Sequence, residues 1–485
     1  MTKELRRLSI LVLAMFLLLF GSTTWIQVIS ADALADNPAN SRTRYDSFQV
    51  QRGSIIVDGS AIASSVPSTD VYAWQRVYTD PAMWAPVTGY VNPALGSATG
   101  IEQAMNPELS GTGNAQFLSR LDEIVTGQPR QGANVVLTLD AKVQKAAFDA
   151  LGAQQGAVVA IEPKTGRVLA MVTSPSYDTN SLAVHDPDAV NATYDALNAQ
   201  ANHPLYNRAI AGDMNPPGST FKLVTASAAL ASGKYTPQST LPNPAAYQLP
   251  QSSSYVHNSW GGTCGSGDTV TIADAIRLSC NIPMAELAVQ LGDSAIRAEA
   301  EKYGFNKSLS IPLDSEASVY PPGLDAPQTA LSGFGQGQVR ATPLQMAMVS
   351  AGIANGGMVM NPRMVDRVIG SDLSVQRTFD NTEFGRSLDP NLAAEMTQMM
   401  VSSVSDGAAS NARIDGIQVA GKTGTAENGA SDPYTLWFTG FAPADDPQVA
   451  VAVVVENGGG QGQSGSGNDI AAPIAKKVME AVLGK

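Results

Sequence analysis

The stretch Pro216-Pro217-Gly218-Ser219-Thr220-Phe221-Lys222 decides how the rest of the chain is interpreted, and an apolar, Ala-rich run follows it over residues 223–230. Proline and glycine fit poorly inside helices, so they mark a turn, and the run predicts a helix that begins near Ser219. A serine in a first helical turn lies beside unpaired backbone N–H groups and the positive end of the helix dipole. Lys222 falls on the same helical face. A Ser–Lys nucleophile requires this arrangement of a hydroxyl and a partly desolvated amine.

Two further segments strengthen this interpretation, because S-x-x-K alone also fits a serine N-cap followed by an exposed lysine. Ser279-Cys280-Asn281 lies between two helical patterns, and Lys422-Thr423-Gly424-Thr425 lies within the extended segment 417–426. S-x-x-K, S-x-N and K-T-G in this order form the motif set of penicillin-binding proteins and class A β-lactamases. The chain therefore resembles the penicillin-binding proteins, and specifically the high-molecular-weight class B transpeptidases.

The resemblance covers about the last two-thirds of the chain. It includes a hairpin-like segment at 156–177, N-R-A-I at 207–210, a helix-opening segment at 335–345, and strand-like segments at 437–443 and 449–456. Nearer the amino end, R-G-S-I-I-V-D-G at 52–59 resembles a short signature of class B pedestal regions, with its Asp one residue late.

The order of the predicted elements favours an α+β fold. Strand-like segments occur at 156–162, 167–173, 417–427, 436–441 and 449–456, and mostly helical patterns lie between them. Such an order implies an antiparallel sheet closed by long-range pairing, with a helical lobe over it. A strand at 134–140 and a helix at 141–151 precede this domain, a helix at 470–483 ends it, and the Gly-rich stretch 458–467 predicts a mobile connector.

The predicted domain organisation is a cytoplasmic tail at 1–7, a transmembrane anchor at 8–29, an N-terminal pedestal and linker at 30–150, and a transpeptidase domain at 151–485. The apolar run 8–29 is long enough to span a bilayer, and the basic residues before it predict a cytoplasmic amino terminus. A cleaved signal peptide is the alternative, because Ala33-Leu34-Ala35 fits a cleavage site. Either alternative places the catalytic domain outside the cytoplasm, in a cell-membrane protein if the anchor is retained.

Composition excludes some classes of function. A net charge of −13 argues against a nucleic-acid partner, which would need a basic surface. The three histidines have no metal-ligand spacing, so no metal site is expected, and the resemblance implies no cofactor. Outside the cytoplasm the two cysteines, Cys264 and Cys280, favour one disulfide, although two unpaired thiols remain the alternative. A bridge would close a loop of about 15 residues, which chain entropy values at roughly 3 kcal/mol.

The resemblance also implies a role for each motif residue. Ser219 would attack the carbonyl of a D-alanyl-D-alanine stem peptide, with Lys222 as the candidate base. Ser279 would relay a proton to the leaving amine, and Asn281 would orient Lys222 or the substrate. Burial beside the Lys422 ammonium would lower the pKa of Lys222.

The K-T-G-T segment would bind the carboxylate of the substrate. Thr423 and Thr425, two apart on a strand, should present both hydroxyls on one face, where they would bind the substrate carboxylate beside Lys422 and Gly424. The backbone N–H groups of Ser219 and Thr425 would form the oxyanion hole.

Cross-linking of peptidoglycan stem peptides has alternatives among the functions that the sequence patterns allow. Residues 416–423 match the Walker A pattern of nucleotide-binding proteins. A P-loop needs a helix directly after Lys-Thr, whereas residues 417–420 are strand-like and residues 424–429 are a poor helix start, so nucleotide binding is rejected. The same three motifs also serve D,D-carboxypeptidases, β-lactamases and penicillin-sensing receptors, which remain alternatives. The expected partners are stem peptides, β-lactams, the membrane and a membrane glycosyltransferase.

Overall fold

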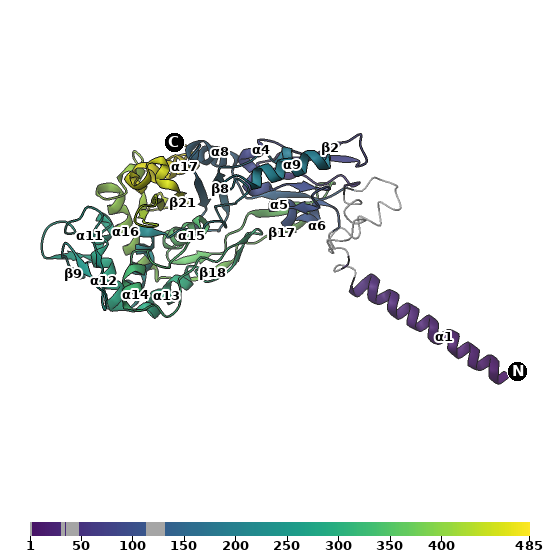
Figure 1. Ribbon diagram of the computed structural model, residues 1–485, viewed down its shortest axis with the longest axis horizontal. Helices are drawn as coiled ribbons and strands as arrows, with labels where there is room; N and C mark the ends of the chain where they lie inside the picture. The colour runs from purple at the N-terminus through teal and green to yellow at the C-terminus, as the bar shows by residue number, and fades with distance from the viewer. Residues whose placement is uncertain (1, 31–33, 35–47, 113–130) are drawn as a thin grey trace.

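The computed structural model describes residues 2–30, 34, 48–112 and 131–485 (Figure 1). The fold is α+β, as predicted, with a central antiparallel sheet, a helical lobe and a smaller N-terminal sheet. Figure 1 shows the N-terminal strands at one end of the globular part and helices α11, α12 and α14 at the other. Within the predicted pedestal and linker region at 30–150, a short polar linker is expected at 36–47, and these residues lie outside the described ones.

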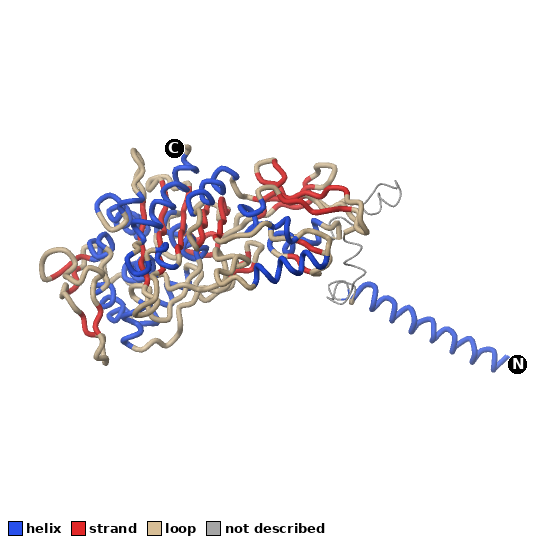
Figure 2. Tube along the Cα trace, turned by 45° about the horizontal axis from the view of Figure 1, so that its top comes forward, coloured by secondary structure: helices blue, strands red, loops and turns tan. Residues whose placement is uncertain are grey.

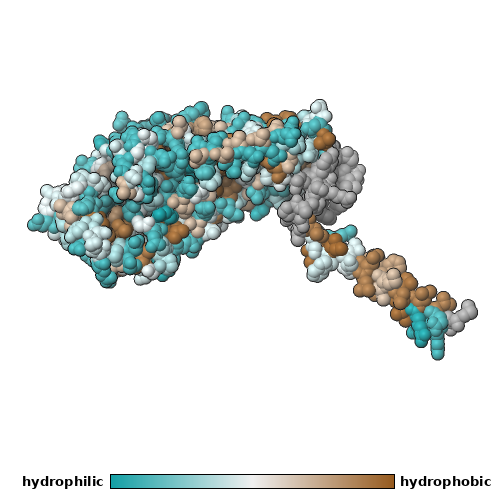
Figure 3. All heavy atoms as spheres, viewed as in Figure 1, coloured by the Kyte–Doolittle hydropathy of each residue, from teal (hydrophilic) through white to brown (hydrophobic). Residues whose placement is uncertain are grey.

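The first described segment is apolar and exposed. Helix α1, Thr2–Thr24, continues into a π-helical turn, η1, Trp25–Ile29. The span Lys3–Ile29 has 27 residues and a mean hydropathy of 2.1, so it is long and apolar enough to cross a membrane. Its side chains are not covered by protein, as Leu18 at 74% exposure illustrates, and Figure 3 shows a mostly brown helix with teal side chains at its amino end.

The central sheet has the strand order β19-β20-β21-β7-β8, all antiparallel. Its strands are β7 Gly156–Ile161, β8 Val168–Ser174, β19 Ala420–Ala426, β20 Thr435–Ala442 and β21 Val449–Val455. The sequence of β21, VAVAVVV, is buried throughout, as expected for a β-branched strand covered on both faces. The sheet therefore joins two segments separated by about 250 residues in the chain, as the order of predicted strands implied.

Helices cover both faces of this sheet (Figure 2). Helices α8, Ala141–Leu151, and α17, Ala472–Leu483, pack on one face and share a buried apolar cluster with it. Helix α15, Pro343–Ala354, packs on the other face; it is apolar almost all round, as a helix buried on every side must be. Helix α8 was assigned to the pedestal by the predicted boundary at residue 150, yet it packs on the catalytic sheet.

The helical lobe lies beyond α15 and the edge strand β19. It contains α10 Lys222–Ala231, α11 Ile272–Leu278, α12 Ile282–Leu291, α13 Asp293–Lys302, α14 Ala326–Ser332 and α16 Pro390–Asp406. Short two-stranded sheets border it: β9 Thr240–Pro242 with β12 Thr269–Thr271, β10 Tyr247–Gln248 with β11 Tyr255–Val256, β13 Leu309–Ser310 with β14 Asp314–Ser315, and β15 Met358–Met360 with β18 Glu383–Arg386.

The N-terminal sheet has the order β17-β16-β6-β1-β2-β3. Its strands are β1 Ile55–Val57, β2 Ser60–Pro67, β3 Trp74–Tyr78, β6 Asn134–Leu137, β16 Val365–Ile369 and β17 Val375–Thr378. The nearby helices are α4 Pro81–Thr88, α5 Gly100–Ala104, α6 Asn106–Leu109 and α9 Pro187–Asn198. A small two-stranded sheet pairs β4 Val91–Asn92 with β5 Ser97–Ala98. Strands β16 and β17 come from the segment that the sequence assigned to the catalytic domain, so the chain returns to complete the pedestal sheet.

Arg52 of the pedestal signature has a structural role. Its guanidinium donates to both a side-chain and a main-chain oxygen of Glu102, and Arg76 donates to the second carboxylate oxygen of the same residue. Glu102 is fully buried, and the two guanidinium groups hold its pKa below the usual range despite that burial. The signature therefore marks a buried ion cluster within the N-terminal domain.

Candidate active site

The predicted nucleophile lies on a tight helical turn in front of the edge strand. Residues Gly218–Phe221 form a 3₁₀ turn, η4, and the α-helix α10 begins at Lys222, so the predicted start near Ser219 is a 3₁₀ turn rather than an α-turn. Residues i and i+3 eclipse one another in a 3₁₀ turn, which brings Ser219 and Lys222 to one side. Ser219 is half-buried, whereas Lys222 is completely buried in the apolar helix.

Three glycines let the turn approach its neighbours closely. Gly218 has φ +53°, which favours glycine, and a Cβ there would lie 3.1 Å from Ala426 Cβ. A Cβ on Gly335 would lie 2.1 Å from Gly218 O, and one on Gly424 would lie 3.0 Å from Pro217 O. The nucleophile turn thus contacts both β19 and the loop at 333–342 between α14 and α15, which we call the 335 loop.

The two motif lysines converge on Ser279. Lys222 Nζ donates to Ser279 O at 2.6 Å and to Asn281 Oδ1 at 2.8 Å. Lys422 Nζ donates to Ser279 Oγ at 2.6 Å and to Thr423 O at 2.9 Å. The structure therefore brings together residues that lie on three separate segments of the sequence.

Burial lowers the pKa of both lysines. Burial, reinforced by the nearby Lys422 ammonium, holds the pKa of Lys222 well below its usual range. Burial lowers the pKa of Lys422 to about 7. A neutral lysine has two N–H donors and one lone pair. Both donors of Lys222 are used by Ser279 O and Asn281 Oδ1, so the lone pair is the remaining position around Nζ at which a proton can be accepted.

The S-x-N motif lies where α11 ends and α12 begins. Ser279 caps α11 in the left-handed region, with φ +64°, a conformation that costs a non-glycine residue on the order of 1 kcal/mol or more. Asn258 holds the following residues in place, because its buried Oδ1 accepts from Asn281 N at 2.8 Å and from Ile282 N at 3.2 Å. Its Nδ2 donates to Gly262 O at 2.8 Å.

A disulfide joins Cys264 to Cys280 in the structure, with their Cα atoms 5.7 Å apart. Asn243 fixes the other side of this loop: its Oδ1 accepts from Cys264 N at 2.6 Å, and its Nδ2 donates to Gly267 O at 2.9 Å. The Gly-rich loop at 260–267 is thereby attached to the centre of the S-x-N motif by a covalent bond and by the Asn258 amide.

The K-T-G-T strand differs in one respect from the expectation. Thr423 Oγ1 donates to Ala408 O at 3.0 Å, and Thr425 Oγ1 accepts from Gly467 N at 3.2 Å. The Thr423 proton is therefore engaged with the main chain, whereas Thr425 keeps its proton for another acceptor. Of the two hydroxyls expected to bind a carboxylate, only that of Thr425 is arranged to donate without a rearrangement.

The stretch 458–467 forms 3₁₀ turns (η6 Asn457–Gly460 and η7 Gly462–Ser464) and leads into a π-helical turn (η8 Gly467–Ala471). A Cβ on Gly467 would lie 2.3 Å from Gly424 O and 2.5 Å from Trp437 O. The predicted connector thus packs directly against the K-T-G strand.

Glu456 organises the approach to the nucleophile and was not singled out by the motifs. Its carboxylate accepts from Asn215 Nδ2 at 3.0 Å, Arg208 Nε at 3.2 Å and Gln155 Nε2 at 2.6 Å. Trp437 Nε1 donates to Pro216 O at 3.0 Å and fixes the next residue along. Asn258, Asn243 and Glu456 carry no motif in a single sequence; position 456 was recognised only as the end of a strand.

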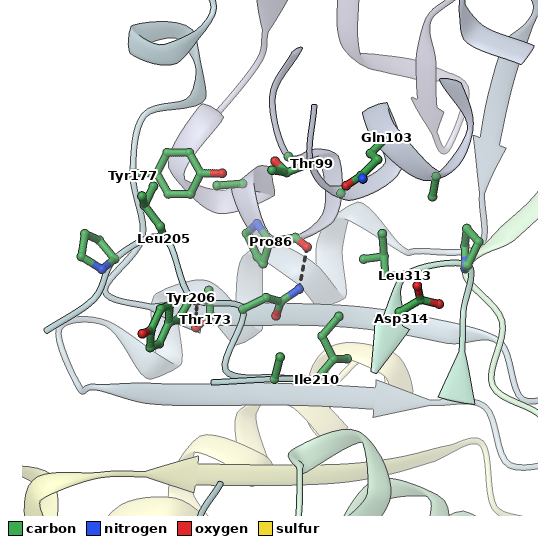
Figure 4. A pocket seen from close by; sticks show the side chains of 18 residues that line it. Pro86, Thr99, Gln103, Thr173, Tyr177, Leu205, Tyr206, Ile210, Leu313 and Asp314 are labelled. Atoms are coloured by element: carbon green, nitrogen blue, oxygen red, sulfur yellow. Dashed lines mark hydrogen bonds between the residues drawn. The ribbon is translucent and has the colours of Figure 1, made fainter. Parts of the chain in front are cut away.

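Within the residues that the structure describes, no group of three or more His, Cys, Asp or Glu side chains gathers where a metal ion could be held. A cavity of about 420 Å³ lies instead between helices α4 and α5 and the segment 204–211, and Figure 4 shows Tyr177, Tyr206, Gln103 and Asp314 around it. None of the predicted site residues lines this cavity.

Comparison with known proteins agrees with the motif set. Residues 156–480 match the family model of the penicillin-binding protein transpeptidase domain, and residues 52–135 match that of the penicillin-binding protein A dimerisation domain. The chain is 40% identical to the peptidoglycan D,D-transpeptidase PbpA of Mycolicibacterium smegmatis over 100% of this chain and 99% of that protein. It is 39% identical to PbpA of Mycobacterium tuberculosis H37Rv with the same coverage.

Solved structures of penicillin-binding protein A are also similar to this chain. The ceftriaxone acyl-enzyme complex of penicillin-binding protein A from M. tuberculosis has a TM-score of 0.87 and 38% identity, covering 90% of this chain and 100% of that one. The penicillin G acyl-enzyme complex of the same protein has a TM-score of 0.85, with the same identity and coverage.

Proposed function

Because this chain belongs to the class B penicillin-binding proteins, we infer that it is a peptidoglycan D,D-transpeptidase, which cross-links stem peptides through an acyl-serine intermediate and is acylated by β-lactams. The similar proteins are named as D,D-transpeptidases, and solved relatives carry β-lactams as acyl-enzymes. The residues that carry out the reaction in this chain are our proposal.

One observation carries the assignment: two buried lysines donate hydrogen bonds to two different oxygens of Ser279. Lys222 bonds to the main-chain oxygen of Ser279, and Lys422 bonds to its hydroxyl. A neutral amine three residues after a half-buried serine, on the same helical face, can supply a base, and a protonated amine on the Ser279 hydroxyl can supply an acid. The site thus has both groups that acyl transfer from an amide requires.

Acylation begins when Ser219 Oγ attacks the carbonyl carbon of the penultimate D-alanine and Lys222 Nζ takes the hydroxyl proton. The oxyanion that forms is bound by the backbone N–H groups of Ser219 and Thr425. When the C–N bond breaks, the leaving amine takes a proton from Ser279 Oγ, and Lys422 replaces it. The products are an ester on Ser219 and free D-alanine.

Cross-linking reverses these proton transfers. The amine of an acceptor stem peptide attacks the ester carbonyl, gives its proton to the relay, and Ser219 leaves with a proton returned by Lys222. A β-lactam gives the same ester, but its nitrogen stays tethered to the acyl group, so the leaving group remains in the site and the adduct persists.

The carboxylate of the terminal D-alanine is proposed to lie between Lys422 and Thr425. The Thr425 hydroxyl keeps its proton for an acceptor, and Lys422 supplies positive charge. Thr423 contributes through its carbonyl, which fixes Lys422, and Gly424 contributes by its small size, which allows contact with the nucleophile turn.

We also propose that Lys3–Ile29 anchors the protein in the cell membrane by a single span, with the tail at 1–7 in the cytoplasm and the catalytic domain outside it. The length and hydropathy of this helix support the proposal. A membrane glycosyltransferase is proposed as the partner that supplies glycan strands, since transpeptidation acts on a polymer made elsewhere.

The test is to incubate the detergent-solubilised full chain with glycan strands that carry pentapeptides and to analyse the muropeptides after digestion. A transpeptidase gives cross-linked dimers and one free D-alanine per cross-link. Release of D-alanine without dimers would identify a carboxypeptidase instead. Rapid turnover of penicillin would identify a β-lactamase.

A further inference from the structure

We infer that Gln336 sets the register of the donor peptide by occupying the edge of strand β19 directly beyond Thr425. This inference rests on the proposed transpeptidase function and assigns a positioning role to a residue outside the three motifs. The inference follows from two features: β19 is an edge strand, and the main-chain N–H and C=O of Glu427, directly after it, bond to the Gln336 amide.

The side chain of Gln336 imitates a paired strand. With its amide oriented to satisfy both contacts, its nitrogen donates to Glu427 O at 3.2 Å and its oxygen accepts from Glu427 N at 2.9 Å. Two residues in an antiparallel pair exchange the same two bonds. Gln336 therefore takes the place that one residue of an added strand would have beside Glu427.

Strand β19 is an edge strand of the central sheet, with β20 as its neighbour on one side. Backbone groups of alternate residues in such a strand point to the same edge. Glu427 lies two residues after Thr425, so the main-chain groups of both residues face the edge that carries the Gln336 amide. This is the edge to which an extended peptide would add, as in β-strand addition.

The backbone of the 335 loop fixes Gln336 in this place. Gly335 O accepts from Gly218 N at 3.0 Å, and Gln336 N donates to Leu331 O at 3.1 Å. The loop approaches Gly218 so closely that a side chain at 335 would collide with it. Gln336 thus connects the nucleophile turn to the end of β19, which keeps the position of its amide constant relative to Ser219.

The direction of the donor peptide follows from the site. Its terminal carboxylate lies near Lys422, and its scissile carbonyl lies at the N–H of Thr425, so the residues that precede the scissile bond continue toward Glu427. The donor can pair with Thr425, but the residue that would pair with Glu427 meets the Gln336 amide. We therefore expect the donor to leave the strand edge after its third residue from the carboxyl end.

A side-chain amide also bonds to both main-chain groups of one residue at the edge of the N-terminal sheet. Asn180 Nδ2 donates to Tyr78 O at 2.9 Å, and Asn180 Oδ1 accepts from Tyr78 N at 2.9 Å. Tyr78 belongs to β3, which ends that sheet. A side-chain amide that closes an edge strand is thus used twice in this fold.

The experiment compares two donors on the detergent-solubilised full chain: acetyl-Lys-D-Ala-D-Ala and the same peptide with two further α-linked alanines at its amino end. Release of D-alanine gives kcat/KM for each, and penicillin acylation of Ser219 is measured in parallel. The variants are Gln336→Ala and Gln336→Glu. Gln338→Ala is the matched control, because this glutamine lies on the same loop and is exposed.

In the wild type and in Gln338→Ala, we expect the two extra residues to change kcat/KM by less than about twofold. The Gln336 amide already occupies the main-chain groups of Glu427, so these residues cannot pair with the strand edge there. In Gln336→Ala, the ratio of long to short donor should rise about fivefold, the change that one added hydrogen bond gives. Gln336→Glu retains an acceptor for Glu427 N but no donor, so its ratio should rise less. Penicillin acylation should stay within about threefold in all variants.

An unchanged donor ratio in both Gln336 variants would overturn the inference. It would also be overturned if both donors and penicillin acylation fell together in Gln336→Ala, because that result describes a merely structural residue. A wild-type chain that neither released D-alanine nor formed an ester on Ser219 would instead refute the proposed function.

Discussion

Replacement of Lys222 by alanine tests the proposed base. Lys222 is fully buried, its pKa is held well below its usual range, and its two donors are engaged with Ser279 O and Asn281 Oδ1. Removal of a positioned general base costs about 10²- to 10⁴-fold in rate. We therefore expect penicillin acylation to fall at least about 100-fold, which corresponds to about 2.7 kcal/mol in the activation free energy.

The effect on stability should be small, since two contributions oppose each other. Loss of the amine removes two hydrogen bonds, worth about 1 kcal/mol each. However, the pKa of Lys222 is depressed in the folded chain, so folding disfavours its charged form, and truncation removes that cost. We expect the free energy of unfolding to change by no more than about 1 kcal/mol.

The assay follows a fluorescent penicillin by stopped flow and the unfolding midpoint by calorimetry. Lys222→Met keeps much of the side-chain length without the amine and should lose as much acylation as Lys222→Ala. Lys234→Ala, which removes an exposed lysine just beyond the same helix, should acylate normally. Acylation within about threefold of the wild type in Lys222→Ala would refute the assignment of Lys222 as base.

Three further predictions concern the surroundings of Lys222. Reduction of the Cys264–Cys280 disulfide should slow acylation and lower stability by roughly 3 kcal/mol; two alkylatable thiols in native, unreduced protein would contradict the bond. Asn258→Ala should lower stability by about 1–3 kcal/mol and slow acylation, whereas Asn258→Asp, which keeps the acceptor, should do less; equal effects in both variants would count against its positioning role. Burial lowers the pKa of Lys422 to about 7, so this residue loses its proton as pH rises through that value. Acylation that depends on proton transfer from Lys422 through Ser279 should therefore decline above that pH. An acylation rate that stays level from about pH 6 to about pH 9 would be inconsistent with the relay.

The local elements were predictable where a pattern and a cap coincide. The helix predicted at 141–151 has those bounds in the structure, because Asp140 caps its first turn and Gly152 ends it. Strand β21 was predictable from its run of β-branched residues, VAVAVVV. The order of the predicted strands and helices indicated the sheet and the helical lobe, and the motif order indicated the family, which the comparisons confirm.

What could not be predicted depends on long-range packing. The hairpin β16–β17 pairs with β6, more than 200 residues earlier in the chain, and nothing in its own sequence indicates that partner. The close approach of Lys222 and Lys422 was expected only through the resemblance. The packing of Gly467 against Gly424 was likewise hidden, since a Gly-rich run has the same composition whether it is mobile or packed.

Side-chain partners inside the site were also beyond the sequence. The expectation that Thr423 and Thr425 both bind a carboxylate followed from strand periodicity, but Ala408 O takes the proton of Thr423. Ala408 lies two residues after the end of α16, and only the folded chain brings it to β19. Gln336 was part of a recognised segment, yet its contact with Glu427 depends on the same tertiary arrangement.

The central claim is that Ser219 carries the acyl group. The most direct measurement is mass spectrometry of peptides from the full chain after penicillin treatment, with Ser219→Ala as the matched variant. We predict that one peptide containing Ser219 gains the mass of intact penicillin and that the adduct is absent from Ser219→Ala, which keeps the wild-type unfolding midpoint. A stable adduct on any other residue, or an adduct that survives in Ser219→Ala, would contradict the account.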